Sequence, residues 1–308
     1  MRDEAPARPR PSSLSPHPLI LHAALFSVSA LFSLNYIVSK VSMHAFAPLS
    51  FAWLRVTGAA IALNLVVPAR GLSRRDSLLV AGFSVLAVVL NQTMFLTGLA
   101  LTSAHIAAIL ITTIPVFALA TALVMRVERA TLAKVGGIAL ALAGALLVIG
   151  AEGVRGITDA LAGALLITGN CVAYAVYLVV SKPAMTRLSP ARVISRMFAI
   201  GAVLMFPIAL PALMREEWRA IPRGAWIGLA VVIAGPTVAA YVINAWTLRH
   251  AESSLVAAYT YVQPVLTTVL AWLFLNERIR PVVALAAVLI FAGVALAGKR
   301  DVAQPIME

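Results

Sequence analysis

One stretch that decides the fold occurs twice in this chain, as IPVFALATALVMRVER at residues 114–129 and as QPVLTTVLAWLFLNER at residues 263–278. Each copy contains a Pro-Val pair and then a Glu-Arg pair, an Ala-Gly pair follows each copy, and the spacings between these pairs are the same in both. Counted to the Ala-Gly pair, the first repeat runs from Pro115 to Gly144 and the second from Pro264 to Gly293, and each lies within long apolar segments. A duplicated, apolar, helix-rich chain is typical of secondary transporters, whose substrate site lies between the two halves.

The composition favours a chain that is embedded in a membrane. Of its 308 residues, 61% are hydrophobic and 12% are charged, whereas an average soluble domain has about 25% charged residues. Apolar segments of roughly 18 to 25 residues recur along the chain, and this length crosses about 30 Å of hydrocarbon. Because hydrocarbon offers no hydrogen-bond partners, each such segment is expected to satisfy its own backbone as a helix.

We therefore predict an all-α integral membrane protein with ten transmembrane helices. The expected spans cover residues 19–40, 47–68, 77–98, 103–125, 132–150, 159–181, 190–212, 224–247, 253–275 and 281–298. Residues 19–150 and 151–298 are predicted to form two five-helix repeats, between a disordered cytoplasmic tail at 1–18 and another cytoplasmic tail at 299–308. Because five is an odd number, the two halves must enter the membrane in opposite directions, which makes them inverted repeats.

The net charge of +12 raises the question of a nucleic-acid partner, but the positions of the charges indicate membrane topology instead. With both termini on the inner side, fifteen Lys and Arg residues lie on the inner side and six on the outer side. Because cytoplasmic loops are enriched in these residues, we expect both termini in the cytoplasm. The expected setting is the inner membrane of a bacterium, with the lipid bilayer as a partner and no nucleic acid.

A further match between the halves relates Ser39-Lys40, at the end of the first span, to Ser181-Lys182, at the end of the sixth. With the repeated Pro-Val, Glu and Ala-Gly positions and the segment that begins at Asn35, these features resemble the EamA-type carriers of the drug/metabolite transporter superfamily. The resemblance covers residues 19–298, with one departure at Phe32-Ser33, where that family often has Trp-Gly. The resemblance implies two five-helix halves and transport, often outward, of amino acids, nucleobases, vitamins or other metabolites.

Arg55 is the charged residue that says most about a substrate. It lies several residues into the second span, and rough alignment of the halves places Arg196 at the corresponding position. A charged side chain there is costly unless it faces water, a partner or a substrate. A substrate carboxylate would suit the guanidinium of Arg55. The alternative is an arginine that extends to the interface or bonds carbonyl groups at a helix end, which we favour for Arg196.

A polar face on the sixth span and another on the ninth span, which carries Tyr259 and Gln263, complete the predicted substrate site. Asn170, Tyr174 and Tyr177 lie at i, i+4 and i+7 of the sixth span and therefore share one face. Amide and phenol groups suit a substrate that needs both hydrogen bonds and aromatic contact, although such groups also join helices to one another. The residues predicted to bind substrate are Asn35, Arg55, Gln92, Asn170, Tyr174, Tyr177, Asn244, Tyr259 and Gln263.

Other polar and small residues are assigned to the scaffold. Glu128 and Glu277 precede helices, where the helix dipole favours an anion, so we interpret both as structural caps. His105 begins the fourth span and is expected at the outer interface. Gly144 and Gly293 are small enough to let two helices approach closely.

The function that these features favour is ATP-independent, alternating-access export of a small metabolite such as an amino acid. No acidic residue lies at the middle of a predicted span, and no phosphate-binding, zinc or nucleophile motif occurs. We therefore expect no enzyme activity, no metal and no cofactor. A membrane-embedded enzyme and a lipid-binding scaffold are the alternatives, and a nucleobase, a vitamin or a drug-like compound is the alternative substrate. A homodimer is compatible with the sequence.

Overall fold

Helices account for nearly all of the described chain, as the apolar segments predict. The structure is a computed structural model that describes residues 18–67, 72–127, 130–153, 158–240, 243, 246–247, 259, 262–278 and 280–297. No strand occurs among these residues. The expectation of an all-α chain is confirmed for this part of the molecule.

The helices follow one another with short connections. Their bounds are α1 Pro18–Ser42, α2 Pro48–Val66, α3 Arg74–Ser84, η1 Val85–Leu90, α4 Asn91–Leu101, α5 Ala104–Ile111, α6 Ile114–Val124, α7 Leu132–Gly153, α8 Thr158–Arg187, α9 Pro190–Arg215, α10 Arg223–Val232, η2 Ile233–Ala239, α13 Val262–Leu275 and α14 Pro281–Ala297. The segments η1 and η2 are π-helical, and each continues an α-helix without a break.

Seven helical segments within the described residues are long and apolar enough to cross a membrane. They are Pro18–Ser42, Pro48–Val66, Arg74–Leu101, Ala104–Val124, Leu132–Gly150, Asp159–Met185 and Pro190–Arg215. Three shorter apolar helices follow, at Arg223–Ala239, Val262–Leu275 and Pro281–Leu296. Each falls on one of the ten predicted spans, although the arrangement as a ten-helix inverted repeat stays a prediction.

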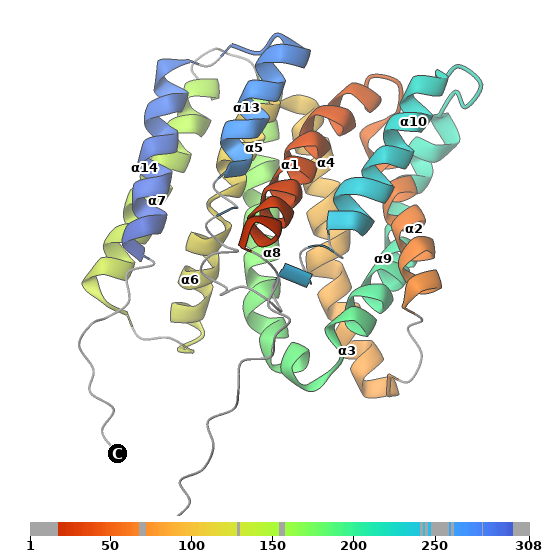
Figure 1. Cartoon of the computed structure of the whole chain (residues 1–308), viewed down its shortest axis with the longest axis horizontal. Helices are drawn as coiled ribbons and strands as arrows, with labels where there is room; N and C mark the ends of the chain where they lie inside the picture. The colour runs from red at the N-terminus through yellow and green to blue at the C-terminus, as the bar shows by residue number, and fades with distance from the viewer. Residues whose placement is uncertain are drawn as a thin grey trace, which may run out of the picture.

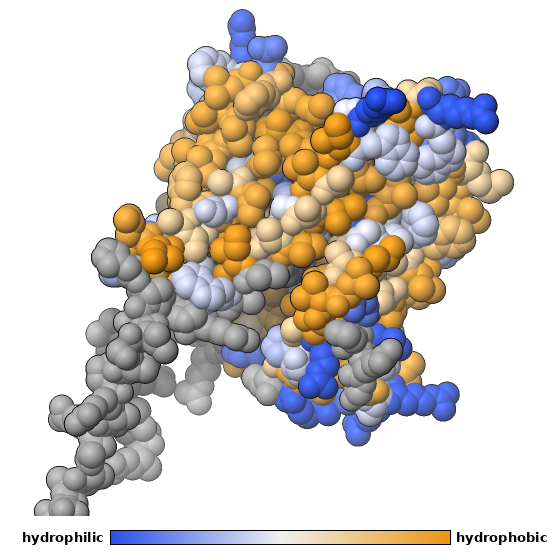
Figure 2. Space-filling model, turned by 45° about the vertical axis from the view of Figure 1, so that its right-hand side comes forward, coloured by the Kyte–Doolittle hydropathy of each residue, from blue (hydrophilic) through white to orange (hydrophobic). Residues whose placement is uncertain are grey.

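The surface of the bundle matches an environment of hydrocarbon between two layers of water. Figure 2 shows apolar residues over the side of the molecule and hydrophilic residues gathered at its two opposite ends. Large apolar side chains such as Leu65, Val203 and Trp272 are exposed on the described helices. Because soluble monomers rarely expose contiguous apolar areas of this kind, the belt indicates contact with lipid.

The third and eighth predicted spans each contain a π-helical segment. In the third span the π-helical segment η1 follows α3, and in the eighth span η2 follows α10. The two segments start at Val85 and Ile233, which are separated by nearly the same length of chain as Pro115 and Pro264 of the sequence repeat. A π-helical turn shifts the helix face by one residue and is common at functional sites. Both halves therefore carry the same local distortion at matching positions.

The fourth predicted span is divided into two helices. The first, α5, ends at Ile111, and α6 starts at Ile114 with Pro115 in its first turn. The hydroxyl groups of Thr112 and Thr113 donate to the carbonyl oxygens of Ile109 and Leu110, both at 2.6 Å. These bonds satisfy carbonyl groups at the end of α5, which a membrane-embedded helix end requires.

Close packing of helices from the two predicted halves holds the bundle together. In Figure 1, α7 and α14 run side by side, and the contacts between elements also join α2 to α9, α1 to α13 and α4 to α8. The approach of α7 and α14 depends on glycine. A Cβ added to Gly293 would lie 2.5 Å from the nitrogen of Ala141, and one added to Gly144 would lie 2.8 Å from the oxygen of Ala286. The expectation that these glycines permit close approach is confirmed.

We predict that Gly293→Ala lowers the free energy of unfolding by about 1–3 kcal/mol, because overpacking forces the two backbones apart. The matched control is Gly150→Ala on α7, where an added Cβ would meet nothing within 4 Å. Thermal unfolding of the purified protein, followed by tryptophan fluorescence, measures both. Equal melting temperatures for Gly293→Ala and the parent would contradict the packing argument.

Candidate functional site

A buried arginine lies at the centre of the first polar cluster. Arg55 on α2 is 7% exposed, and its Nε donates to Oγ1 of Thr237 at 3.4 Å. Thr237 lies in η2, and its own hydroxyl donates to the carbonyl oxygen of Val232 at 2.9 Å. The bond spans five residues, as the π-helical turn allows, and it orients the threonine towards α2. The distortion in η2 therefore supplies a polar contact for a guanidinium that is enclosed by apolar helices.

A chain of three amide side chains connects α4 to α8. Nε2 of Gln92 donates to Oδ1 of Asn91 at 3.0 Å, and Nδ2 of Asn91 donates to Oδ1 of Asn170 at 2.5 Å. Asn91 is the first residue after η1, so this π-helical segment is also adjacent to a polar group. The buried Oε1 of Gln92 accepts no hydrogen bond from the part of the chain that the structure describes.

Tyr36 of α1 interacts both with Arg55 and with α4, the helix that carries Asn91 and Gln92. Its ring meets Phe95 of α4 edge to face, with the ring centroids 5.5 Å apart. Phe95 lies one helical turn beyond Asn91, and the Tyr36 phenol is within electrostatic reach of Arg55. We call Tyr36, Arg55, Asn91, Gln92, Asn170 and Thr237 the central polar layer. It joins α1, α2, α4, α8 and η2 inside the bundle.

The two tyrosines of the predicted aromatic face differ in their burial. Tyr177 is 7% exposed and packs edge to face on Phe83, with centroids 6.0 Å apart, whereas Tyr174 is half-buried. The two phenol rings are 5.5 Å apart and tilted. Tyr177 therefore has the surroundings of a core residue, and Tyr174 has the better exposure for a ligand contact.

The predicted residues near α13 contact the first helix. Ser29 donates to the backbone oxygen of Tyr259 at 2.7 Å, and Ser33 donates to that of Gln263 at 3.1 Å. The Tyr259 hydroxyl lies 2.8 Å from Nδ1 of His22. Two serines of α1 thus bind the backbone of this segment.

The contacts of the eight predicted residues that the structure describes fall into several groups. Arg55, Gln92 and Asn170 belong to the central polar layer, and Asn35 lies next to Tyr36, where it accepts a hydrogen bond from Ser39 at 3.2 Å. Tyr174 and Tyr177 continue along α8, and Tyr259 and Gln263 lie against α1. Asn244 is outside the described residues. Substrate binding by these residues stays a prediction.

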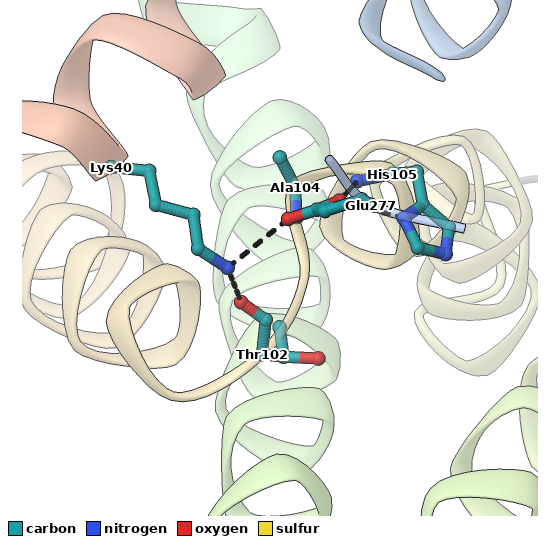
Figure 3. A network of polar contacts seen from close by, with 5 residues as sticks. All are labelled: Lys40, Thr102, Ala104, His105 and Glu277. Carbon is teal, nitrogen blue, oxygen red and sulfur yellow. Dashed lines mark hydrogen bonds and ion pairs between the residues drawn. The ribbon is translucent and has the colours of Figure 1, made fainter. Parts of the chain in front are cut away.

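A second polar cluster lies at one end of the bundle (Figure 3). Glu277 lies in the connection between α13 and α14, and its Oε1 accepts from the backbone nitrogen of Ala104 at 2.9 Å. Its Oε2 is 2.7 Å from Nδ1 of His105 and accepts from the backbone nitrogen of the same residue at 3.3 Å. Nζ of Lys40, in the last turn of α1, is 3.3 Å from Oε1 and also donates to the carbonyl oxygen of Thr102.

Local backbone geometry places Glu277 against the start of α5. The helix α13 ends at Leu275, and Asn276 has a φ of 53°, the left-handed conformation that asparagine tolerates better than most residues. The backbone nitrogen of Glu277 then donates to the oxygen of Ala271 at 3.2 Å. This turn reverses the chain and directs the carboxylate to the start of α5, where the helix dipole favours an anion.

The contacts of Glu277 keep its carboxyl group ionised. Burial by itself would raise the pKa of Glu277. The hydrogen bonds from His105 and from the nitrogen of Ala104, together with the positive charge of Lys40, lower that pKa to about 2. The Glu277 side chain is 12% exposed, and those of Lys40 and His105 are 19% and 7% exposed. The cluster is thus largely shielded from water.

One expectation about this end is corrected. Glu277 was expected to cap the helix that it precedes, yet the helix that it caps is α5, far away in the sequence. His105 was expected at the outer interface; its side chain is buried against Glu277 at one end of the bundle, and the side of the membrane on which this end lies stays a prediction. In the sequence, this cluster is indicated only by a lysine and a glutamate that recur in both halves, as Lys40 and Lys182 and as Glu128 and Glu277. The sequence pattern does not show that Lys40 and Glu277 are in contact. Glu128 lies outside the described residues.

A cavity of about 430 Å³ lies between α6 and α8. Its wall is made of Pro115, Ala118, Leu119, Ala122, Val127, Leu178, Val179, Lys182 and Pro183. Lys182 is exposed and lies near the end of α8, which is opposite to the end where Glu277 lies (Figure 1). None of the eight predicted binding residues that the structure describes lines this cavity. No group of His, Cys, Asp and Glu within the described residues could hold a metal ion.

Comparison with known proteins adds relatives over most of the chain. An uncharacterized transporter of Archaeoglobus fulgidus is 26% identical over 282 residues, which cover 89% of this chain and 96% of that relative. A probable terminal-alkyne amino-acid exporter of Streptantibioticus cattleyicolor is 25% identical, with 85% and 87% covered. The uncharacterized transporter YoaV of Bacillus subtilis is 24% identical, with 88% and 94% covered.

A solved crystal structure shares the fold. It matches with a TM-score of 0.58 at 21% identity, and the match covers 91% of this chain and 96% of that one. The model of the EamA-like transporter family matches residues 19–150 and 161–298. With these matches and its apolar helices, the chain is a multi-pass membrane protein that belongs to the EamA-like transporter family.

Proposed function

We propose that this protein is a secondary, ATP-independent carrier that exports a small metabolite with a carboxylate group, such as an amino acid, by alternating access. The observation that carries the proposal is the buried Arg55 beside an amide chain in the central polar layer. Burial of a guanidinium inside an apolar bundle costs free energy unless the group faces water, a partner or a substrate. Its planar fork of donors matches the two oxygens of a carboxylate.

The remaining groups of the layer suit the rest of an amino acid. Oε1 of Gln92 is a buried acceptor that an ammonium group could reach, and Tyr36 and Phe95 offer aromatic surface to an apolar side chain. In a water-excluding layer, a substrate that leaves any of these polar groups unpaired binds poorly. This requirement favours a zwitterion with a modest side chain over a neutral compound, although nucleobases, vitamins and drug-like compounds remain alternative substrates.

A difference between the two ends of the bundle supports alternating access. Lys40 and Lys182 occupy corresponding positions in the sequence repeat. Lys40 lies in the cluster with Glu277, whereas Lys182 is exposed on the wall of a cavity. The repeated π-helical segments likewise favour two structurally related halves. A carrier built from inverted repeats is expected to close one end while the other is open.

The relatives support export more than the alternatives. One of them is named as a probable amino-acid exporter and two as transporters, which argues against a membrane-embedded enzyme or a lipid-binding scaffold. On this proposal the protein lies in the bacterial inner membrane with both termini in the cytoplasm. Its partners are the substrate and the bilayer, and a homodimer is one assembly to test.

Counterflow in ATP-free proteoliposomes tests the proposal. Vesicles loaded with an unlabelled amino acid should accumulate the labelled compound transiently, because a carrier exchanges substrate without an energy source. A thermal-shift screen of amino acids selects the compound, since a ligand of the folded state raises its melting temperature. Chemical conversion of the compound would indicate an enzyme. Absence of movement for every compound that binds would favour a scaffold.

We predict a graded loss of affinity at Arg55. Arg55→Lys keeps the charge but loses the bidentate geometry, so binding of the selected amino acid should weaken by an intermediate amount. Arg55→Gln should weaken it further, by about 2–5 kcal/mol, because the substrate carboxylate then lacks its charged partner. Binding is measured by calorimetry and exchange by counterflow.

The charge-matched control for this series is Arg192→Gln, because Arg192 is exposed on α9. This control should bind and exchange substrate as the parent does. An uncharged analogue of the substrate should bind Arg55→Gln about as well as it binds the parent. Normal affinity for the amino acid in both Arg55 variants would exclude Arg55 from the site.

The two tyrosines of α8 should respond differently. Tyr177→Ala should lower the melting temperature clearly, because removal of a buried aromatic ring costs about 3–5 kcal/mol. Tyr174→Ala should weaken substrate affinity and change the melting temperature much less, since its ring is half-buried. If Tyr174→Ala loses stability and keeps its affinity, this part of α8 is packing surface and not a binding face.

A further inference from the structure

We infer that Lys40, Glu277 and His105 form a proton-sensitive latch that closes one end of the transport path, and that a proton bound by the Glu277 carboxylate opens it. The inference rests on the proposed alternating-access function, since a latch needs an end that opens. It assigns a binding site for a proton to a group that lies outside the central polar layer.

The latch joins three segments that are far apart in the sequence. They are the last turn of α1, the first turn of α5 and the connection between α13 and α14. One carboxylate connects them, because Oε1 meets Lys40 and Ala104 while Oε2 meets His105 (Figure 3). Removal of the negative charge from this single group therefore weakens each link that Glu277 makes between the segments.

The chemistry of the neighbours explains why protonation releases them. Glu277 faces Lys40 on α1 and His105 on α5, and Arg278 and Arg280 flank it in its own segment. The start of α5 adds the positive end of a helix dipole. A neutral carboxylic acid cannot balance the positive charges of Lys40, Arg278 and Arg280, and its protonated oxygen becomes a donor and a much poorer acceptor for a backbone nitrogen. Lys40 is then held only by the carbonyl of Thr102 among the contacts described here.

The sign of the pH effect follows from the closed geometry. The pKa of Glu277 is lowered from its ordinary value of 4.5 to about 2 in the closed arrangement. The closed form therefore binds a proton more weakly than a carboxyl group with the ordinary pKa does. The stabilisation is fully present above about pH 4.5 and is lost as the pH falls towards 2. Acidification should accordingly shift the population to the open form.

Cysteine accessibility at residue 103 tests the latch directly. Ser103 lies between two residues of the cluster, and its hydroxyl is buried. The background is Cys171→Ser, because Cys171 is the only cysteine in the chain. Sealed vesicles carrying Ser103→Cys are treated with a membrane-impermeant thiol reagent, without substrate. Each rate is divided by that of a cysteine at the exposed Glu217, which corrects for the effect of pH on thiol chemistry.

The expected result is slow labelling of residue 103 at pH 7 and labelling about tenfold faster at pH 3.5, which lies within the range where the stabilisation is lost. Glu277→Gln, which mimics the protonated acid, should label fast at both pH values. The matched control is Glu216→Gln. Glu216 also accepts from a helix N-terminus, at the nitrogen of Ala47 at 3.2 Å, without a lysine or histidine partner in the described contacts. This control should label at the parent rate.

Two results would overturn the latch. One is a corrected rate in the parent that does not change between pH 7 and 3.5, a measurement that needs no substitution at Glu277. The other is equal acceleration by acid in the parent and in Lys40→Gln, whose latch is already weakened. Counterflow on the same vesicles separates the two proposals. Exchange without pH-dependent labelling removes the latch alone, and pH-dependent labelling without exchange of any compound removes the proposed function.

Discussion

A helix that ends inside a membrane bundle leaves backbone groups without partners, and this constraint shapes the ends of the molecule. At α5 the backbone nitrogens of Ala104 and His105 bind the carboxylate of Glu277, which comes from the other end of the sequence. At α2 the nitrogen of Ala47 binds Glu216 in the same manner. In both places a carboxylate from a distant connection completes a helix. The connections therefore link the helices, and moving one helix end requires breaking such a link.

The same constraint explains where the interior of the bundle is irregular. Thr237 reaches Arg55 because η2 departs from α-helical geometry, and Asn91 begins the amide chain where η1 ends. A regular helix would present these side chains on a different face. Polar chemistry inside an apolar bundle is thus obtained by local distortion, while rigid contacts such as the one between Gly293 and Ala141 preserve the frame around it.

The sequence predicts the frame better than it predicts the site. Helix α8, for example, covers the predicted span 159–181 because a long apolar segment must form a helix in hydrocarbon. The buried environment of Arg55 also follows from its place within a span, but its partner Thr237 could not be inferred, since periodicity assumes a regular helix. Tyr174 and Tyr177 share a predicted face, yet packing against Phe83 divides their environments. The link from Glu277 to α5 depends on tertiary structure, and no local pattern encodes it.

Alternating access requires that one end of the molecule is closed when the other is open, and two distances measured together test this requirement. One pair of spin labels replaces the exposed Val41 and Arg278 at the Lys40 end, and another replaces Val127 and Arg187 at the Lys182 end, both in the Cys171→Ser background. Pulsed electron paramagnetic resonance then measures each distance in lipid nanodiscs at pH 7 and pH 3.5. Acid should lengthen the first distance while it shortens the second. Distances that change in the same direction, or that do not change at all, would contradict it.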